Sequence, residues 1–101
     1  MLEVKSIREF NEIITHDKVL VLFYATWSSS SLAMNEVLDD LKDELKEFEI
    51  VKVNMDRFLE LTRIYHITSV PDIKIFIKGK VAKDILGIKT KDELLNILKD
   101  N

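Results

Sequence analysis

The amino-acid sequence predicts an α/β protein with a mixed central β-sheet and helices on both faces of that sheet. Segments patterned like strands take turns with segments of helical periodicity, and this alternation is typical of a layered α/β fold. An unbroken apolar run over 19–24, rich in strand-forming residues, is typical of a strand covered on both sides. With 101 residues, 47% of them hydrophobic, the chain can bury one core but not two. We therefore expect residues 1–101 to form a single domain.

The N-terminal part of the chain predicts a short strand over 2–4 and a first helix over 6–15. Ser6 and Glu9 have the spacing of a capping box, in which each side chain accepts a hydrogen bond from the other residue's backbone. The apolar residues that follow recur at helical spacing: Ile7, Phe10, Ile13 and Ile14. The apolar strand over 19–24 comes next.

A long amphipathic helix is expected over 31–48. Its apolar residues form one stripe: Met34, Val37, Leu38, Leu41, Leu45 and Phe48. A strand over 50–54 and a short helix over 58–65 follow it. Because strand, helix and strand occur in succession, we expect two parallel strands joined by a right-handed crossover.

The C-terminal part predicts a β-hairpin and a last helix. Strands over 73–77 and 81–86 flank the turn residues Lys78-Gly79, which indicates an antiparallel pair. Thr90 and Glu93 form a second capping box that begins the last helix. The expected order is therefore βαβαβαββα, with no linker or internal repeat.

Charge and composition exclude several function classes. The 15 basic and 18 acidic residues are mixed along the chain and give a net charge of −3, which argues against a nucleic-acid or anionic-membrane partner. No apolar run approaches the ~20 residues that a membrane helix needs, and the first ten residues are charged and polar, unlike a signal peptide. We expect a cytoplasmic monomer. Because the chain has no cysteine, no metal-ligand cluster and no glycine-rich phosphate loop, we expect neither a metal nor a cofactor.

The strand over 19–24 continues into Ala25-Thr26-Trp27-Ser28-Ser29-Ser30-Ser31. This stretch resembles the active-site strand and loop of the thioredoxin family, whose pattern ends in Trp-Cys-Gly-Pro-Cys or a variant. Trp27 matches, and Ser28 and Ser31 stand where the two cysteines belong. Val70-Pro71 resembles the cis-proline of the family. The resemblance spans essentially the whole chain and implies the thioredoxin fold and membership of the thiol–disulfide oxidoreductases of cell redox homeostasis.

The chemistry of this family needs two thiols three residues apart at the start of a helix, because one must ionise and the other must resolve the mixed disulfide. Ser28 and Ser31 supply neither step, so as catalytic positions they are inactive. Leu22 stands where thioredoxins usually carry a buried acid that assists proton transfer. Lys52 aligns with the lysine near that acid, and we expect it to pair with Asp72 or to extend to water.

The resemblance also implies a binding site for an extended peptide or protein substrate at Trp27, Val70 and Pro71. It implies a cis peptide bond before Pro71, a form found in only about 5–6% of bonds before proline. Glu36 stands where many members have a helix-kinking proline, so the helix is expected to continue through it.

Two other readings of the serine run are weaker. A serine nucleophile needs a base within hydrogen-bond reach, and neither His16 nor His66 lies in a recognisable triad pattern. Hydroxyl and N–H groups at a helix start also suit an anion, although helix capping explains the serine run more simply.

The sequence leaves three origins open. The chain is a thiol–disulfide oxidoreductase with both active-site cysteines replaced by serine, a naturally redox-inactive peptide-binding or chaperone-like module, or a designed domain. Replacement of both cysteines by the isosteric residue favours the first origin, whereas Leu22 favours the second.

Overall fold

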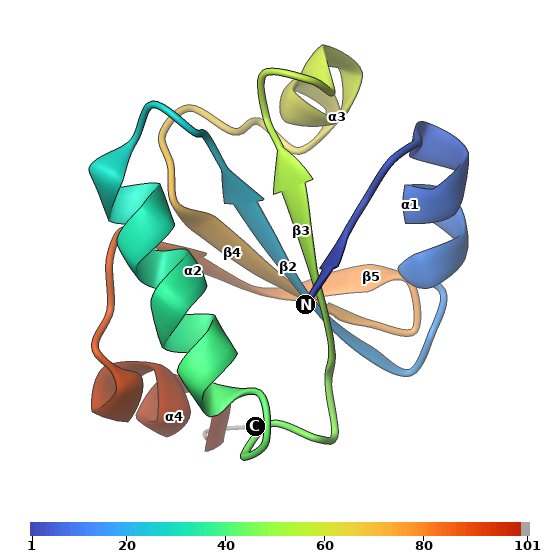
Figure 1. The fold of residues 1–101 in the computed structure, drawn as a ribbon. Coiled ribbons are helices and arrows are strands. Elements are labelled where there is room, and N and C mark those ends of the chain that lie inside the picture. Colours follow the sequence, from blue (N-terminus) through green and yellow to red (C-terminus); the bar gives the residue numbers. More distant parts are fainter. Residues whose placement is uncertain (100–101) are drawn as a thin grey trace.

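The computed structural model describes residues 1–99 and contains a five-stranded sheet and four helices (Figure 1). The elements occur in the predicted order: β1 (Leu2–Glu3), α1 (Ile7–Ile13), β2 (Lys18–Tyr24), α2 (Ser29–Leu41), β3 (Glu49–Asn54), α3 (Leu59–Ile64), β4 (Asp72–Ile77), β5 (Lys80–Leu86) and α4 (Lys91–Lys99). The predicted α/β class and element order are therefore confirmed.

The sheet has the strand order β1-β3-β2-β4-β5. β3 pairs in parallel with β1 and β2, whereas β4 is antiparallel to both β2 and β5, so the sheet is mixed as predicted. β2 lies in the middle of the sheet, and every residue of it after Lys18 is buried. A strand covered on both faces needs apolar residues at every position, which is why this run is unbroken.

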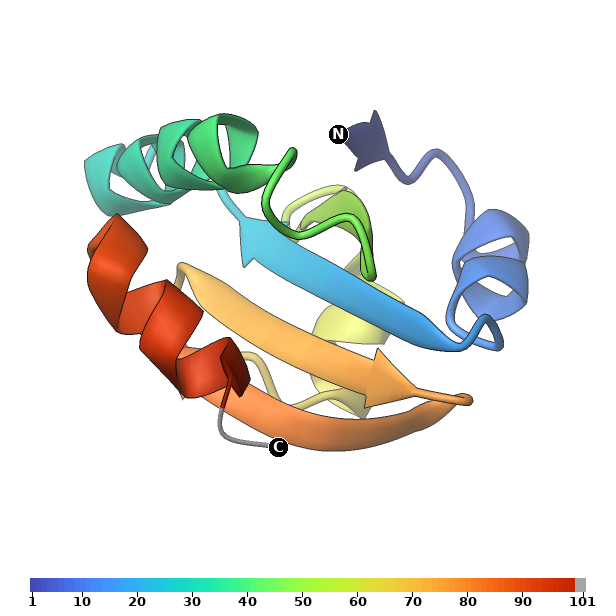
Figure 2. The same ribbon diagram turned by 90° about the horizontal axis from the view of Figure 1, so that it is seen from below.

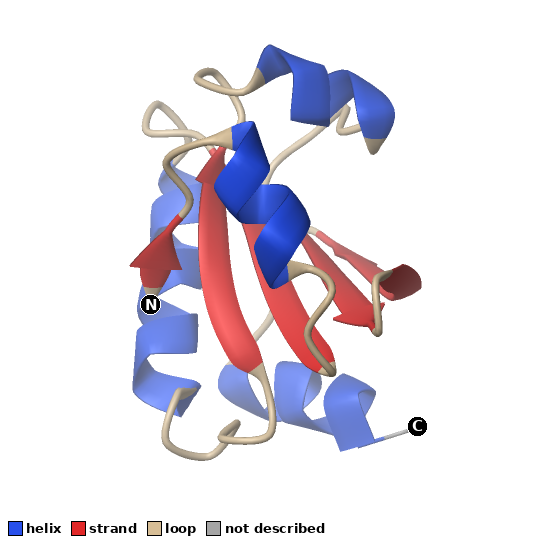
Figure 3. Cartoon of the chain, turned by 90° about the vertical axis from the view of Figure 1, so that its right-hand side faces the viewer, coloured by secondary structure: helices blue, strands red, loops and turns tan. Residues whose placement is uncertain are grey.

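The helices form two layers, one on each face of the sheet. α2 and α4 cover one face, and α1 and α3 cover the other (Figures 2 and 3). Successive residues of β2 supply the two cores in turn, because side chains alternate across a strand. Leu20 and Leu22 pack under α2 and α4, whereas Val21 and Phe23 pack under α1 and α3.

Aromatic rings fill the core on the α1 side. Phe10 of α1 lies with its ring centroid 6.4 Å from Phe23, 5.6 Å from Tyr65 and 6.0 Å from Phe76. The contacts with Tyr65 and Phe76 have the edge-to-face geometry that aromatic quadrupoles favour. This cluster fixes α1 against the sheet.

The predicted helix over 31–48 is wrong at its C-terminal end, because α2 ends at Leu41. Leu45 and Phe48 are still buried on the same core, but they lie in consecutive turns. The last turn of α2 has no basic residue, and acidic residues crowd this end, where the helix dipole favours positive charge. The helix is uninterrupted through Glu36, as the sequence predicts.

The two predicted capping residues begin their helices. Ser6 Oγ accepts a hydrogen bond from the N–H of Glu9 at 3.0 Å, while the Glu9 carboxylate accepts one from the N–H of Lys5. The box at Thr90 and Glu93 is reciprocal: each backbone N–H donates to the other side chain, at 3.0 and 3.1 Å. These hydrogen bonds also hold the pKa of Glu93 below its usual value.

Candidate functional site

Ser28 caps the N-terminus of α2. It has an extended backbone, and its Oγ accepts a hydrogen bond from the N–H of Ser31 at 3.1 Å. The carbonyl of Ser28 accepts a bond from the N–H of Leu32 at 3.1 Å, which starts the helical ladder. The side chain of Ser28 therefore satisfies one of the first N–H groups of the helix, which would otherwise lack a partner.

Ser31 lies one turn into α2 and is fully buried. Its Oγ accepts a hydrogen bond from the N–H of Ala25 at 3.3 Å, across the loop that joins β2 to α2. The hydroxyl therefore ties this loop to the helix, and no histidine or carboxylate bonds to it among the contacts of residues 1–99.

Trp27 projects from the same loop, with 69% of its surface exposed. Its indole Nε1 donates to Asp56 Oδ2 at 2.7 Å, and Asp56 in turn donates its backbone N–H to Asn54 Oδ1 at 3.0 Å. The sequence analysis missed Asp56. An acid two residues after β3 is the signal that could have indicated it, since β3 runs parallel to β2 and both strands end on the same side of the sheet.

Val70 and Pro71 enter the site from the segment before β4. The peptide bond between them is cis, Pro71 is buried and Val70 is half-buried. Phe23 near the end of β2 pairs with Asp72 at the start of β4, so Pro71 lies at the same edge as the serine loop (Figure 1). The carbonyl of Pro71 accepts a hydrogen bond from the N–H of Gly87 at 3.0 Å, which ties this segment to the end of β5.

Lys52 does not pair with Asp72, so the first of its two expected arrangements is wrong, and its side chain is 24% exposed. Its Nζ donates to Asn35 Oδ1 at 3.4 Å, lies 3.9 Å from Glu3 Oε1 and sits 5.4 Å from the ring centroid of Tyr24. Lys52 pairs in register with Leu22 and shares its face of the sheet, whereas Asp72 points to the opposite face. The two side chains therefore lie on opposite faces of the sheet, which keeps them apart.

Tyr24 completes the polar group around Lys52. Its hydroxyl donates to Glu3 Oε2. Burial, together with that hydrogen bond to a carboxylate, raises the pKa of Tyr24 to about 12. The phenol therefore stays protonated at neutral pH and holds β1 to the end of β2.

A second polar group that the sequence analysis missed lies directly after Pro71. Lys74 Nζ is 3.0 Å from Asp84 Oδ2 and 3.6 Å from Asp72 Oδ1, and the Asp72 and Lys74 side chains are only 3% and 7% exposed. Burial, and a hydrogen bond with Asp84, raise the pKa of Asp72 to about 7, although the nearby ammonium acts to lower it. That hydrogen bond lowers the pKa of Asp84.

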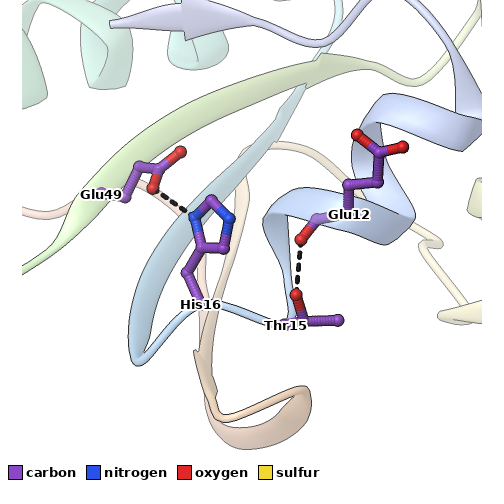
Figure 4. A network of polar contacts seen from close by, with 4 residues as sticks. All are labelled: Glu12, Thr15, His16 and Glu49. Carbon is purple, nitrogen blue, oxygen red and sulfur yellow. Dashed lines mark hydrogen bonds and ion pairs between the residues drawn. The ribbon is translucent and has the colours of Figure 1, made fainter.

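Both histidines are outside the serine loop. His16 precedes β2, and its Nδ1 contacts Glu49 Oε1 at 2.6 Å (Figure 4). Because the 7 residues of β2 rise about 3.3 Å each, His16 and Ser28 lie at opposite ends of that strand. His66 follows α3 in the left-handed region, with φ of 54°. Within residues 1–99, neither histidine hydrogen-bonds to Ser28.

A cavity of about 270 Å³ also opens far from the serine loop, where β2 begins. Its lining combines charged and apolar side chains: Lys18, Glu44, Leu45, Glu47, Leu95, Leu98 and Lys99. Within residues 1–99, no group of three or more histidine or acidic side chains is arranged to hold a metal ion. Over the same residues, no helix has the length and hydropathy needed to cross a bilayer.

Comparisons with known proteins agree with this geometry. A thioredoxin family model matches residues 2–100. Thioredoxin from Chlamydia caviae is 31% identical over 101 residues, covering 100% of this chain and 99% of that protein. Thioredoxin from Mycoplasmoides gallisepticum is 33% identical over 85 residues, covering 84% and 85%. The structure of Plasmodium falciparum thioredoxin superposes with a TM-score of 0.91 at 25% identity, covering 98% of this chain and 97% of that one. The chain therefore belongs to the thioredoxin family.

Proposed function

We propose that this chain is a redox-inactive thioredoxin that binds an extended segment of a partner protein at Trp27, Val70 and Pro71. Ser28 and Ser31 stand at the positions of the two redox cysteines. The observation that carries the proposal is the use of both hydroxyls: Ser28 Oγ caps α2, and Ser31 Oγ is buried against the N–H of Ala25. Both side chains support the loop, and neither can form a disulfide.

The geometry at Pro71 supports binding of an extended peptide. Pairing within the sheet begins at Asp72, so Val70 precedes the ladder at the edge where the serine loop also lies. A peptide that adds as a strand beside Val70 gains main-chain hydrogen bonds, and its side chains contact neighbouring apolar surface. Trp27 supplies that surface, because most of its indole is exposed while Asp56 fixes its orientation.

Peptide binding is testable with the single tryptophan as its reporter. Carboxymethylated insulin B chain, an extended peptide without free thiols, should change the fluorescence of Trp27. Trp27→Ala should weaken binding tenfold or more, which is about the effect of losing an interface hot spot. Because this variant lacks the fluorescent reporter, its affinity is measured by calorimetry. Val81→Ala on β5 is the matched control, since Val81 is 45% exposed and lies in another part of the sheet. Equal affinities of the two variants would show that the peptide does not bind at the groove proposed between Trp27, Val70 and Pro71.

The proposal assigns the loss of activity to the missing thiols, and a double variant tests this. Ser28→Cys with Ser31→Cys should reduce insulin disulfides in the presence of dithiothreitol, whereas the parent chain should not exceed the reductant alone. The thiolate at position 28 attacks a substrate disulfide, forming a mixed disulfide and releasing one substrate thiolate, which takes up a proton. The thiol at position 31 then loses its proton and attacks the sulfur at position 28. The protein is left oxidised, and the substrate is released as two thiols.

Leu22 is the second missing part of that chemistry. Adding Leu22→Asp to the double variant should speed resolution of the mixed disulfide, by up to ~10²-fold if proton transfer limits it. Leu22 is fully buried, so the carboxyl also lowers stability. A folded double variant that forms its own disulfide and never turns over would leave a peptide-binding module as the function.

The second candidate is a naturally redox-inactive peptide-binding or chaperone-like module that never carried the thiols. Leu22 is the observation that favours it. Removal of thiols for crystallisation or trapping gives no reason to remove a carboxyl. The codons at positions 28 and 31 of the source gene separate the two origins. Cysteine codons indicate an oxidoreductase in serine form, and serine codons indicate a naturally redox-inactive protein.

A further inference from the structure

Asp72, Lys74 and Asp84 form a compact charged cluster on the face of the sheet covered by α1 and α3. Lys74 pairs in register with Asp84 of β5, and Asp72 lies two residues before Lys74 on the same face of β4. Asp72 is 2% and Lys74 is 5% exposed. Asp72 Oδ1 is fully enclosed and has no hydrogen-bond partner within residues 1–99, being 3.6 Å from Lys74 Nζ.

The cluster has one basic and two acidic side chains, so one ammonium faces two carboxyl groups. The charged groups that act on Asp72 are Lys74 on its own strand and Asp84 on β5. Tyr65, which lies over Phe23 on the same face, is a further titratable group and stays neutral, because burial raises its pKa. Two carboxyls held beside one ammonium in a buried site cannot both ionise at ordinary cost, and a buried unpaired charge is strongly unfavourable.

The cluster is joined directly to the groove. Asp72 follows Pro71 in sequence and pairs in register with Leu86 of β5. Gly87, the next residue, donates its N–H to the carbonyl of Pro71. A displacement of Asp72 toward water therefore acts on residues directly bonded to both ends of this hydrogen bond.

We propose that this cluster is a pH-sensitive latch on the groove. While the buried Asp72 carboxyl holds its proton, the latch is closed, and loss of that proton favours opening of the contact between Pro71 and Gly87. The peptide-binding consequence rests on the proposed function, because only a closed segment presents Val70 to a partner strand. The affinity of the protein for an extended peptide should then fall as pH rises, in proportion to the fraction of molecules in which the contact between Pro71 and Gly87 is closed.

Amide exchange at Gly87 tests the latch without any peptide. If the carboxyl titrates normally in the open state, each pH unit between about 4 and about 7 multiplies the open population by up to about ten. The protection factor of Gly87 should fall tenfold or more between pH 5.5 and pH 8. Asp72→Asn should abolish this fall, and Asp43→Asn, at an exposed acid of the turn after α2, should behave as the parent. A fall of equal size in Asp72→Asn would overturn the latch.

Low concentrations of urea separate local opening from unfolding. Exchange at Gly87 should be insensitive to urea, whereas exchange at Val53 in β3 should accelerate. Equal acceleration at both amides would assign the pH response to global unfolding and overturn the latch. Asp84→Asn is the second variant: it removes one of the two causes that raise the pKa of Asp72 and leaves burial, so its Gly87 protection should depend less on pH than that of the parent.

Peptide affinity then decides whether the latch controls the groove. The affinity for carboxymethylated insulin B chain should fall severalfold from pH 5.5 to pH 8 for the parent but not for Asp72→Asn. If the protection of Gly87 responds to pH but the ratio of the parent's affinity to that of Asp72→Asn is the same at both pH values, the latch does not control peptide binding. If no variant binds the peptide at either pH, the proposed function fails, and the exchange data alone decide the latch.

Discussion

At the scale of single residues, Asp72 should make the free energy of unfolding depend on pH. Its folded pKa of about 7 lies above its ordinary value of 3.8, so between these values the folded chain binds more protons than the unfolded chain. The free energy of unfolding should therefore decline as pH rises from about 4 to about 7, by at most about 1.4 kcal/mol per unit, and level off above that. The lowered pKa of Asp84 acts in the opposite sense, at pH values below about 4.

Urea denaturation at pH 4.5 to 8.5 measures this decline, and Asp72→Asn isolates the contribution of Asp72 to it. The variant should lose most of the decline and be more stable than the parent at pH 8. A parent and variant whose stabilities change in parallel would show that Asp72 is not the group responsible.

At the scale of elements, the start of α2 depends on one hydroxyl. Ser28→Ala removes the acceptor for the N–H of Ser31 and should lower the free energy of unfolding by about 1 kcal/mol. Ser28→Gly should cost only a few tenths, because glycine leaves that N–H open to water. The exposed neighbour Ser29→Ala is the control and should change stability by less than about 0.5 kcal/mol. Equal losses at positions 28 and 29 would contradict the capping role.

The start of this element was predictable from sequence, and its end was not. Serines before an apolar periodic run indicate a helix start, and the structure has the helix there. The periodic apolar stripe continues to Phe48, but it cannot distinguish helix from turns that bury the same side chains. The excess of acids around Leu41, where residues 39–44 contain four acids and Lys42 as the only base, is the physical signal for the earlier end.

In the candidate site too, some features were predictable from local sequence patterns and others were not. The serine loop and Pro71 carry local patterns, whereas the partners of Lys52 and Lys74 depend on which face of the sheet each occupies. Lys74 lies between Ile73 and Ile75 on a strand that is buried on both faces, so an internal lysine requires an acid nearby. Asp72 has the same parity and was available as that acid, but Asp84 comes from another strand and needs the register.

At the scale of the whole molecule, two cores on opposite faces of β2 should unfold together. Phe10→Ala, which empties the aromatic cluster, should cost about 3–5 kcal/mol, and Leu38→Ala on the other face about 2–5 kcal/mol. Ile88→Ala is the control, since Ile88 is 54% exposed. Denaturation followed by fluorescence and by circular dichroism should give one coincident transition in each variant. Separate transitions would mean that the layers are independent.

The two outer strands determine whether the sheet can recruit further copies of itself. At one edge of the sheet, the two-residue strand β1 pairs with β3 at Val51 and Lys52. At the other edge, the pairing of β5 is irregular opposite Ile75 and Phe76, and β5 carries charged residues that include Lys80. Short strands, irregular pairing and lysines are the usual safeguards against edge-to-edge polymerisation. β1 is thus a cap on the sheet as well as part of it. Its detachment would expose the backbone of β3 as a template for amyloid-like growth.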